Sequence, residues 1–194
     1  MNSELKRLIK IAGTALEAED RFLREAIAKN RTAYPSEKCG ILRNNNERYY
    51  QFIIWRALVS SFPFTARIEI QSHDLVLNYP DDASKWFAVI EMKRWMSSTG
   101  EVEIPGIIRD INDKLRPSHA KNTLMLIFSA GPSGTINTEF GWLSKRLGIS
   151  QVEDCSAWEN YYFPTVNRVG EDVDFWLAGY QVNRANMASE NYET

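Results

Sequence analysis

The sequence predicts a mixed α+β domain of the α/β type, in which a central mixed β-sheet is flanked by helices and preceded by an N-terminal helical extension. Three observations support this prediction. Residues 4–29 carry apolar side chains at intervals of three and four, the pattern of one helical face. Residues 66–93 hold short apolar runs between turn residues. Residues 123–129 form a nearly unbroken apolar run, which is typical of a strand buried on both faces.

The N-terminal helix is expected over residues 4–29. Its apolar stripe consists of Leu5, Leu8, Ile9, Ala12, Ala15, Leu16, Phe22, Leu23, Ala26 and Ile27. We expect this stripe to pack on the rest of the domain, and a homodimer formed through the stripe is the alternative. Residues 30–46 contain proline, glycine and a run of asparagines, so they are predicted to form a loop.

A second helix is expected from Glu47 to about Ser61, because Asn46 can cap its first turn and Pro63 would end it. Residues 80–85 contain proline and aspartates and are predicted to form a turn between two strands. Three strands are predicted in succession after this helix, over residues 66–71, 74–79 and 86–93.

A third helix is expected to follow these strands. Pro105 suits its first turn, and the helix should run to about Leu115 and end before Pro117. The buried strand over residues 123–129 comes next. This order of helix, three strands, helix and strand predicts a meander that is joined by a crossover helix to a fourth strand.

The chain is expected to fold as one domain, because its 194 residues suffice for a single core and contain no clear linker. Beyond the buried strand, residues 138–147 predict a helix and residues 175–182 a strand. We divide the chain into an N-terminal helix and loop, a core and a C-terminal elaboration, which cover residues 1–43, 44–130 and 131–194.

Composition and charge restrict the class of protein. The 44% hydrophobic and 25% charged residues are ordinary for a soluble globular protein. The 23 basic and 25 acidic side chains give a net charge of −2, which argues against a strongly basic nucleic-acid binder of the histone type. The balance leaves room for an enzyme that acts on nucleic acid through a local basic groove.

The cysteines and the hydropathy predict a cytoplasmic protein with no membrane partner. Cys39 and Cys155 are far apart and form no CxxC pair, so neither a disulfide framework nor a structural zinc site is expected. Reduced thiols are typical of the cytoplasm. No stretch reaches the ~18 consecutive apolar residues of a membrane span, and the polar N-terminus is unlike a secretory signal.

Three functional side chains are expected to meet at one end of the predicted hairpin. If Tyr79 lies opposite Trp86, antiparallel pairing places Asp74 opposite Glu91. Lys93 is two residues beyond Glu91 and therefore shares its face. Carboxylate oxygens suit a hard divalent cation such as Mg²⁺, and an ammonium group beside them can bind a phosphate.

The order of the elements, with Asp74 opening the second strand and Glu91-Met-Lys93 ending the third, resembles the PD-(D/E)xK nuclease superfamily. The resemblance covers roughly residues 44–130 and implies a restriction-endonuclease-like core. It implies that Asp74 and Glu91 hold Mg²⁺, for which Mn²⁺ can substitute, and that the carbonyl group of Met92 completes the coordination. It also implies that Lys93 is the catalytic lysine.

The resemblance further implies a supporting acid on the first core helix, at the position of Glu47. The alternative is that Glu47 is an exposed acid favoured at a helix start. Glu69 is a further candidate on the first strand. The sequence departs from the superfamily pattern at His73, which stands where a proline often precedes the first acid.

A literal PD sequence occurs at Pro80 and Asp81, but it lies at the expected hairpin tip. At about 3.3 Å per residue, its distance from Glu91 exceeds roughly 20 Å, too far to share an ion. We therefore interpret Asp81 as a turn residue.

Basic and aromatic side chains could support nucleic-acid binding. Phosphate contacts are one interpretation of the basic residues after the third strand, and a solvated helix face is the other; these residues are Arg109, Lys114, Arg116 and Lys121. A core or dimer role is the favoured interpretation of the aromatic residues, and base stacking is the alternative; these residues are Trp158, Tyr161, Tyr162, Phe163, Phe175, Trp176 and Tyr180.

The resemblance implies a metal-dependent nuclease that hydrolyses phosphodiester bonds, with DNA as the expected partner. A catalytically inactive nuclease-like module that binds DNA or protein is the alternative. In a third interpretation, the ExK sequence is a coincidence in an unrelated α/β protein, and Asp74 and Glu91 would then lie far apart.

Overall fold

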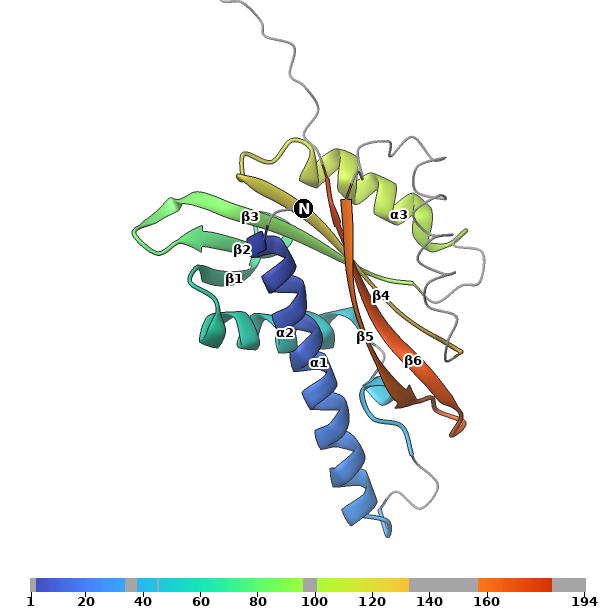
Figure 1. Cartoon of the computed structure of the whole chain (residues 1–194). Coiled ribbons are helices and arrows are strands. Elements are labelled where there is room, and N and C mark those ends of the chain that lie inside the picture. The colour runs from blue at the N-terminus through green and yellow to red at the C-terminus, as the bar shows by residue number, and fades with distance from the viewer. Residues whose placement is uncertain (1–2, 34–37, 45, 96–100, 133–156, 183–194) are drawn as a thin grey trace, which may run out of the picture.

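The computed structural model describes residues 3–33, 38–44, 46–95, 101–132 and 157–182 (Figure 1). Its helices are α1 (Ser3–Lys29), α2 (Glu47–Ser61) and α3 (Glu103–Asp110), with the short helical turns η1 (Ile41–Asn44) and η2 (Ile111–Leu115). Its strands are β1 (Thr65–Ile70), β2 (His73–Tyr79), β3 (Asp82–Arg94), β4 (Asn122–Pro132), β5 (Ala157–Val166) and β6 (Asp172–Gln181).

The described strands form one six-stranded sheet in the order β1-β2-β3-β4-β6-β5. β1, β2 and β3 form an antiparallel meander. The chain then crosses through α3 to β4, which is parallel to β3. β6 pairs antiparallel with β4, and β5 pairs antiparallel with β6. The predicted mixed sheet and the predicted order of helix, three strands, helix and strand are confirmed.

Helices cover both faces of the sheet (Figure 1). α1 and α2 lie on one face, where Ile54 and Leu126 belong to one buried apolar cluster. α3 and η2 lie on the other face, where Ile107 and Ile127 belong to a second cluster. Side chains of β4 alternate between the two clusters, which explains why the predicted buried run is apolar throughout.

The N-terminal helix is confirmed as α1, but its buried face differs from the predicted stripe in the second half. Phe22 is 64% exposed, so its predicted place in the stripe is wrong. Asp20, four residues after Leu16, continues the buried face instead. The Oδ1 atom of Asp20 accepts hydrogen bonds from the backbone N–H of Ile41 at 2.9 Å and the hydroxyl of Thr165 at 2.6 Å. Phe22 follows two residues later, on the opposite side of the helix.

The β2–β3 hairpin has the predicted register in its inner part. Leu77 pairs with Ala88, and the neighbouring pairs toward the β1–β2 turn follow the same register. Nearer the tip, Asn78 pairs with Trp86, which leaves Phe87 as an extra residue of β3 and forms a β-bulge. The predicted register therefore holds from the pair Leu77–Ala88 to the pair Leu75–Ile90 and fails at the hairpin tip.

The turn of this hairpin is shorter than predicted. Tyr79 pairs with Asp82, and β3 begins at Asp82. Only Pro80 and Asp81 lie between the paired residues, so the predicted turn over residues 80–85 is wrong. A second register shift follows the bulge, because Asn78 pairs with Trp86 and Tyr79 with Asp82, which leaves residues 83–85 of β3 between these two pairs.

The remaining elements agree with the sequence in part. The Oδ1 atom of Asn46 accepts a hydrogen bond from the backbone N–H of Arg48 at 2.9 Å, which confirms the predicted cap of α2. β6 confirms the strand predicted over residues 175–182, whereas β5 was not predicted. The predicted helix over residues 138–147 and Cys155 lie outside the described residues. Among the helices of the described ranges, none is both long and apolar enough to span a membrane.

Candidate functional site

Asp74 lies in β2 where the hydrogen-bond ladder of the sheet is interrupted on both sides. Toward β3, its Oδ2 atom accepts a hydrogen bond from the backbone N–H of Met92 at 2.7 Å. Toward β1, its backbone carbonyl accepts from the side-chain amide of Gln51, which also donates to Glu69 Oε1 at 3.2 Å. The β1–β2 pairs on either side of Glu69 and Asp74 are Ile68–Leu75 and Ile70–His73, and Glu69 and Asp74 do not pair with each other. Glu69 has a positive φ of 54°. The carboxylate of Asp74 thus replaces a main-chain acceptor.

Glu91, on β3, is fully buried with 0% of its surface exposed. Its Oε1 atom accepts a hydrogen bond from Nδ1 of His73 at 2.8 Å, and its Oε2 atom accepts from Nζ of Lys114 at 2.7 Å. An ionised acid in a core requires such partners, because desolvation of an unpaired charge is costly. His73 and Lys114 supply these partners for Glu91.

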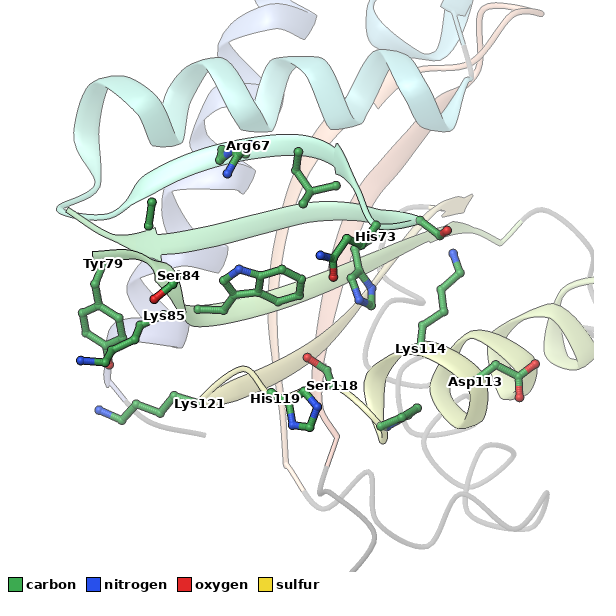
Figure 2. Close-up of a pocket in the computed structure, with 16 residues that line it drawn as sticks. Arg67, His73, Tyr79, Ser84, Lys85, Asp113, Lys114, Ser118, His119 and Lys121 are labelled. Carbon is green, nitrogen blue, oxygen red and sulfur yellow. The ribbon is translucent and has the colours of Figure 1, made fainter. Parts of the chain in front are cut away.

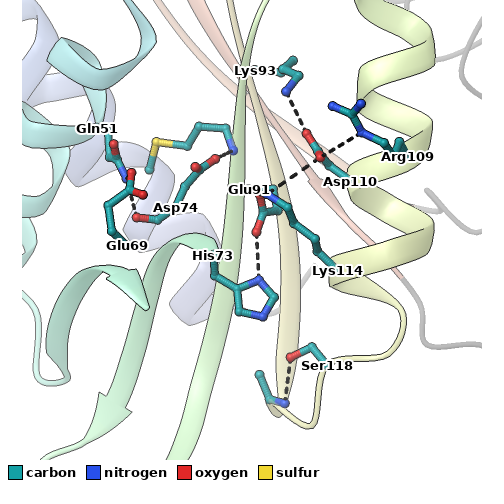
Figure 3. A network of polar contacts seen from close by, with 12 residues as sticks. Gln51, Glu69, His73, Asp74, Glu91, Lys93, Arg109, Asp110, Lys114 and Ser118 are labelled. Atoms are coloured by element: carbon teal, nitrogen blue, oxygen red, sulfur yellow. Dashed lines mark hydrogen bonds and ion pairs between the residues drawn. The ribbon is translucent and has the colours of Figure 1, made fainter. Parts of the chain in front are cut away.

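Lys93 faces α3 as Glu91 does, but its direct partner is a different acid. Its Nζ atom donates to Oδ2 of Asp110, at the end of α3, at 2.7 Å. The other oxygen of Asp110 lies 3.8 Å from Nζ of Lys114. His73, Glu91, Lys114, Asp110 and Lys93 therefore form one connected chain of charges and hydrogen bonds, which we call the Glu91 network (Figure 3).

Glu47, at the start of α2, reaches the same end of β3. Its Oε2 atom accepts a hydrogen bond from the backbone N–H of Arg94 at 3.0 Å. Asp74 accepts from Met92 two residues earlier. Backbone N–H groups that are removed from water need acceptors. The carboxylates of Asp74 and Glu47 supply acceptors along the part of β3 that extends beyond β2.

The acids of this site interact electrostatically. Burial is the largest cause that raises the pKa of Asp74, to about 6, and the negative charges of Glu91 and Glu47 raise it further. The hydrogen bond from Met92 and the charge of Lys114 act in the opposite direction. Burial disfavours the charged form of Lys114, but the hydrogen bond and charge of Glu91 raise the pKa of Lys114 above its ordinary value.

The donor chemistry of the predicted metal ligands fits a hard divalent cation. Asp74 and Glu91 offer carboxylate oxygens and Met92 a carbonyl oxygen, which are groups that Mg²⁺ accepts. Within the described residues, no three histidine, cysteine or acidic side chains converge as a ready-made metal site. Both oxygens of Glu91 are engaged by His73 and Lys114, so cation binding by Glu91 requires Lys114 to withdraw. Asp110 stands 3.8 Å away as an alternative partner for Lys114.

A surface pocket opens beside the Glu91 network. Its volume is about 480 Å³, and its lining includes Glu47, Lys93, Arg94 and Gly106. A Cβ atom at Gly106 would lie 3.2 Å from Cε of Lys93, so α3 approaches the lysine stem closely at this point. Glu47 and Lys93 were predicted as site residues from distant segments of the chain. Both line this one pocket, which opens to solvent.

Asp110 was not identified from the sequence. It lies on the helix face that also carries Ile107, Ile111 and Lys114. An acid and a lysine four residues apart beside buried isoleucines are a signal for a buried charge pair, and this spacing could have revealed them. His73 and Gln51 lie beside the predicted acids, where His73 is hydrogen-bonded to Glu91 and Gln51 donates to the backbone carbonyl of Asp74.

The other predicted binding residues divide into exposed and buried groups. The Arg109 side chain is exposed and lies 3.9 Å from Asp110, and Lys121 is also exposed. The expectation of a core role is confirmed for the buried aromatic residues Phe163, Phe175, Trp176 and Tyr180. Tyr162 is 55% exposed, whereas the side chain of Trp158 lies outside the described residues.

Comparisons with protein-family models, with curated proteins and with solved structures find no match to this chain. The residues of the site therefore carry the functional proposal.

Proposed function

We propose that this protein is a metal-dependent nuclease of the PD-(D/E)xK type, with a restriction-endonuclease-like core, that hydrolyses phosphodiester bonds of DNA. The observation that carries the proposal is the crowding of acids at the functional end of the β2–β3 hairpin. Burial, followed by the charge of Glu91, raises the pKa of Asp74 to about 6. A divalent cation between such carboxylates would relieve both penalties.

The element order supports the same proposal. α2, the antiparallel β1–β3 meander, α3 and the parallel β4 follow each other as the resemblance implies. Glu47 from α2 and Lys93 from β3 line one pocket. These elements bring acids and lysines from four segments of the chain to one end of the sheet.

The residues take distinct roles in this proposal. Asp74, Glu91 and the carbonyl group of Met92 would hold Mg²⁺ or Mn²⁺, and Glu47 would support them. A bound ion would polarise the scissile phosphate. Lys93 would bind a phosphate oxygen and stabilise the negative charge that develops on it. Lys114 would move from Glu91 toward Asp110 when the cation binds.

A second candidate function is a non-catalytic binding module. One observation favours it: Glu91 and Lys93 already have ionic partners in Lys114 and Asp110 at 2.7 Å. A network that satisfies its own charges can stabilise a fold without any metal. The two functions differ in whether the wild-type chain binds a divalent cation.

Calorimetric titration with Mn²⁺ separates these functions. We expect wild type to bind Mn²⁺ and the Asp74→Asn and Glu91→Gln variants to lose at least tenfold in affinity, because each removes a charged ligand. Asp81→Asn is the matched control, since Asp81 is exposed at the hairpin tip. Wild type and the control should cleave DNA in Mg²⁺, and the Asp74→Asn and Glu91→Gln variants should cleave it more slowly. A wild-type protein that binds no Mn²⁺ would rule out the nuclease and favour the binding module.

A further inference from the structure

A second and larger pocket lies on the α3 side of the β1–β3 meander (Figure 2). Its volume is about 1110 Å³. One wall is formed by the meander, including Arg67 of β1 and Trp86 of β3, and the other by the segment after η2, including His119 and Lys121. The pocket reaches from Tyr79, near the hairpin tip, to His73 at the start of β2, a length of roughly 20 Å along the strand.

The lining of this pocket is strongly basic. Among the described residues that line it, Arg67, Lys85, Lys114 and Lys121 are cations and Asp113 is the one acid. Lys85 pairs with Asp82 at 3.1 Å and Lys114 with Glu91 at 2.7 Å. Arg67 and Lys121 are exposed, and neither forms an ion pair with another described residue, so these two supply the free positive charge of the pocket. The whole chain has a net charge of −2, so the pocket concentrates positive charge against the overall balance. Such a groove attracts a chain of phosphates.

The pocket also contains a fixed aromatic side chain. Trp86 is half-buried in its wall, and its ring lies 5.8 Å from that of His73 at an interplanar angle of 90°. The backbone carbonyl of Trp86 accepts a hydrogen bond from the N–H of Lys121 at 2.9 Å, which holds the two walls together. Basic grooves with aromatic platforms bind single strands, because only an unpaired base can offer its face for stacking.

The rim of the pocket is formed in part by the β1–β2 turn. Gln71 and Ser72 have positive φ angles of 50° and 70° and line the pocket. They are the two residues between the paired Ile70 and His73, and a type I′ hairpin turn has positive φ at both central positions. The turn therefore fixes the shape of the rim.

The pocket is connected to the candidate metal site through shared residues. His73 and Lys114 line the pocket, and the same two side chains hold the two oxygens of Glu91. We infer that this pocket binds unpaired DNA, with phosphates on Arg67 and Lys121 and a base stacked on Trp86, and that the strand leads to Glu91. The inference rests on the proposed nuclease function, because the bound strand would be cleaved at the nuclease site. Single-stranded DNA is then the substrate class.

Binding can be tested without cleavage by fluorescence anisotropy in EDTA. The probes are a labelled thymidine homopolymer and a labelled duplex of the same length. We expect wild type to bind the single strand more tightly than the duplex. Arg67→Ala/Lys121→Ala should weaken single-strand binding at least tenfold and reduce the slope of log K against log salt by about 1.4, because two phosphate contacts are lost. Lys10→Ala/Arg21→Ala, which removes two exposed cations of α1, is the charge-matched control.

The stacking contact has its own variant. Trp86→Leu should weaken single-strand binding roughly tenfold and leave duplex binding unchanged. Circular dichroism melting of each variant checks that the fold is retained. Equal affinity of wild type for single strand and duplex, or equal loss in the double variant and its control, would overturn the inference. Mn²⁺ binding without single-strand affinity would reject the pocket alone, whereas single-strand affinity without Mn²⁺ binding would reject the nuclease alone.

Discussion

At the scale of the residue, Asp74 combines a structural duty with an electrostatic cost. Its carboxylate completes the hydrogen bonding of β3 through the N–H of Met92. Its pKa is nevertheless raised to about 6, by burial first and by Glu91 second. The ordinary pKa of an aspartate is near 4, so the folded protein binds a proton more tightly than the unfolded chain does. Ionised Asp74 therefore destabilises the metal-free fold at neutral pH.

This cost predicts that Asp74→Asn stabilises the metal-free protein. The amide oxygen can still accept from Met92, while the repulsion with Glu91 disappears. We expect the variant to be more stable than wild type by about 1 kcal/mol at pH 7.5 in EDTA, measured by urea unfolding. The difference should shrink as the pH falls from 6 toward 4, because wild-type Asp74 then becomes protonated. A variant that is less stable than wild type at pH 7.5 would show that the charge of Asp74 is favourable.

The register of the inner part of the hairpin could be predicted from the sequence, whereas the direct partners of Glu91 could not. Strand alternation and a constant register are local properties, and the predicted register holds from the pair Leu77–Ala88 to the pair Leu75–Ile90. Lys114 reaches Glu91 from a helical segment 23 residues away. Which lysine lies closest to the acid depends on how α3 packs on the sheet, and a strand pattern contains no information about that packing.

At the scale of the element, α3 controls the position of Lys93. Gly106 allows the helix to approach the lysine stem, because a Cβ atom there would lie 3.2 Å from Cε of Lys93. The Nζ atom of the lysine is fixed by Asp110 at the end of the same helix. One helix thus determines both where the stem of Lys93 lies and where its charge points.

Gly106→Ala is expected to separate stability from activity. Alanine favours a helix over glycine by roughly 1 kcal/mol, so thermal stability should stay equal or rise. The added methyl group should displace Lys93 and lower the kcat/KM for DNA cleavage several-fold, while calorimetric Mn²⁺ affinity stays the same. In a Lys93→Met background the substitution should have no further effect on cleavage, as a double-mutant cycle would measure. Full activity of Gly106→Ala would show that Lys93 adjusts freely.

The types of the elements could be predicted where the periodicity of apolar residues was strong. The prediction failed where polar side chains enter the core. α1, α2, β4 and β6 follow their apolar patterns. β5 was missed because aromatic and polar residues mix along it without clear alternation. Asp20 interrupts the apolar stripe of α1 and yet continues its buried face. A pattern of hydrophobicity assigns such a residue to the surface.

At the scale of the whole molecule, Asp20 joins three distant segments. Its Oδ1 atom receives hydrogen bonds from Ile41 of η1 and Thr165 of β5, and Asp20 itself lies on α1. Burial leaves no water to replace these bonds, because only 3% of Asp20 is exposed. The carboxylate of Asp20 therefore attaches α1 to the far edge of the sheet, together with apolar packing, the Lys6–Glu159 ion pair and the hydrogen bond from Tyr161 to Glu17.

Asp20→Ala should lower the free energy of unfolding by about 2 kcal/mol or more, since two buried donors lose their acceptor. Mn²⁺ affinity should be unchanged, because Asp20 lies outside the candidate site. Chemical denaturation measures the first quantity and calorimetry the second, and the exposed Glu25→Ala of the same helix is the control. A stability equal to that of the control would mean that the other contacts of α1 hold the helix without Asp20.

The three-strand meander with its crossover could be predicted at this scale, whereas the basic pocket could not. Arg67 and Lys121 lie on opposite walls and are separated by more than fifty positions of the chain. Their proximity follows from the packing of the segment after η2 against the meander, which no local signal in the sequence reports.

The extra residue in β3 determines which side of the sheet receives the indole of Trp86. Ala88 belongs to the apolar cluster under α1 and α2, and uninterrupted alternation would place Trp86 there as well. Because Phe87 is inserted without a partner, Trp86 instead packs with the cluster under α3. Deleting Phe87 would therefore leave Trp86 on the α3 side, because Trp86 would then adjoin Ala88 directly and still lie opposite Asn78. The indole would turn through the sheet only if the bulge closed with Phe87 retained, so sequences that keep this fold should either keep the bulge or lose its extra residue.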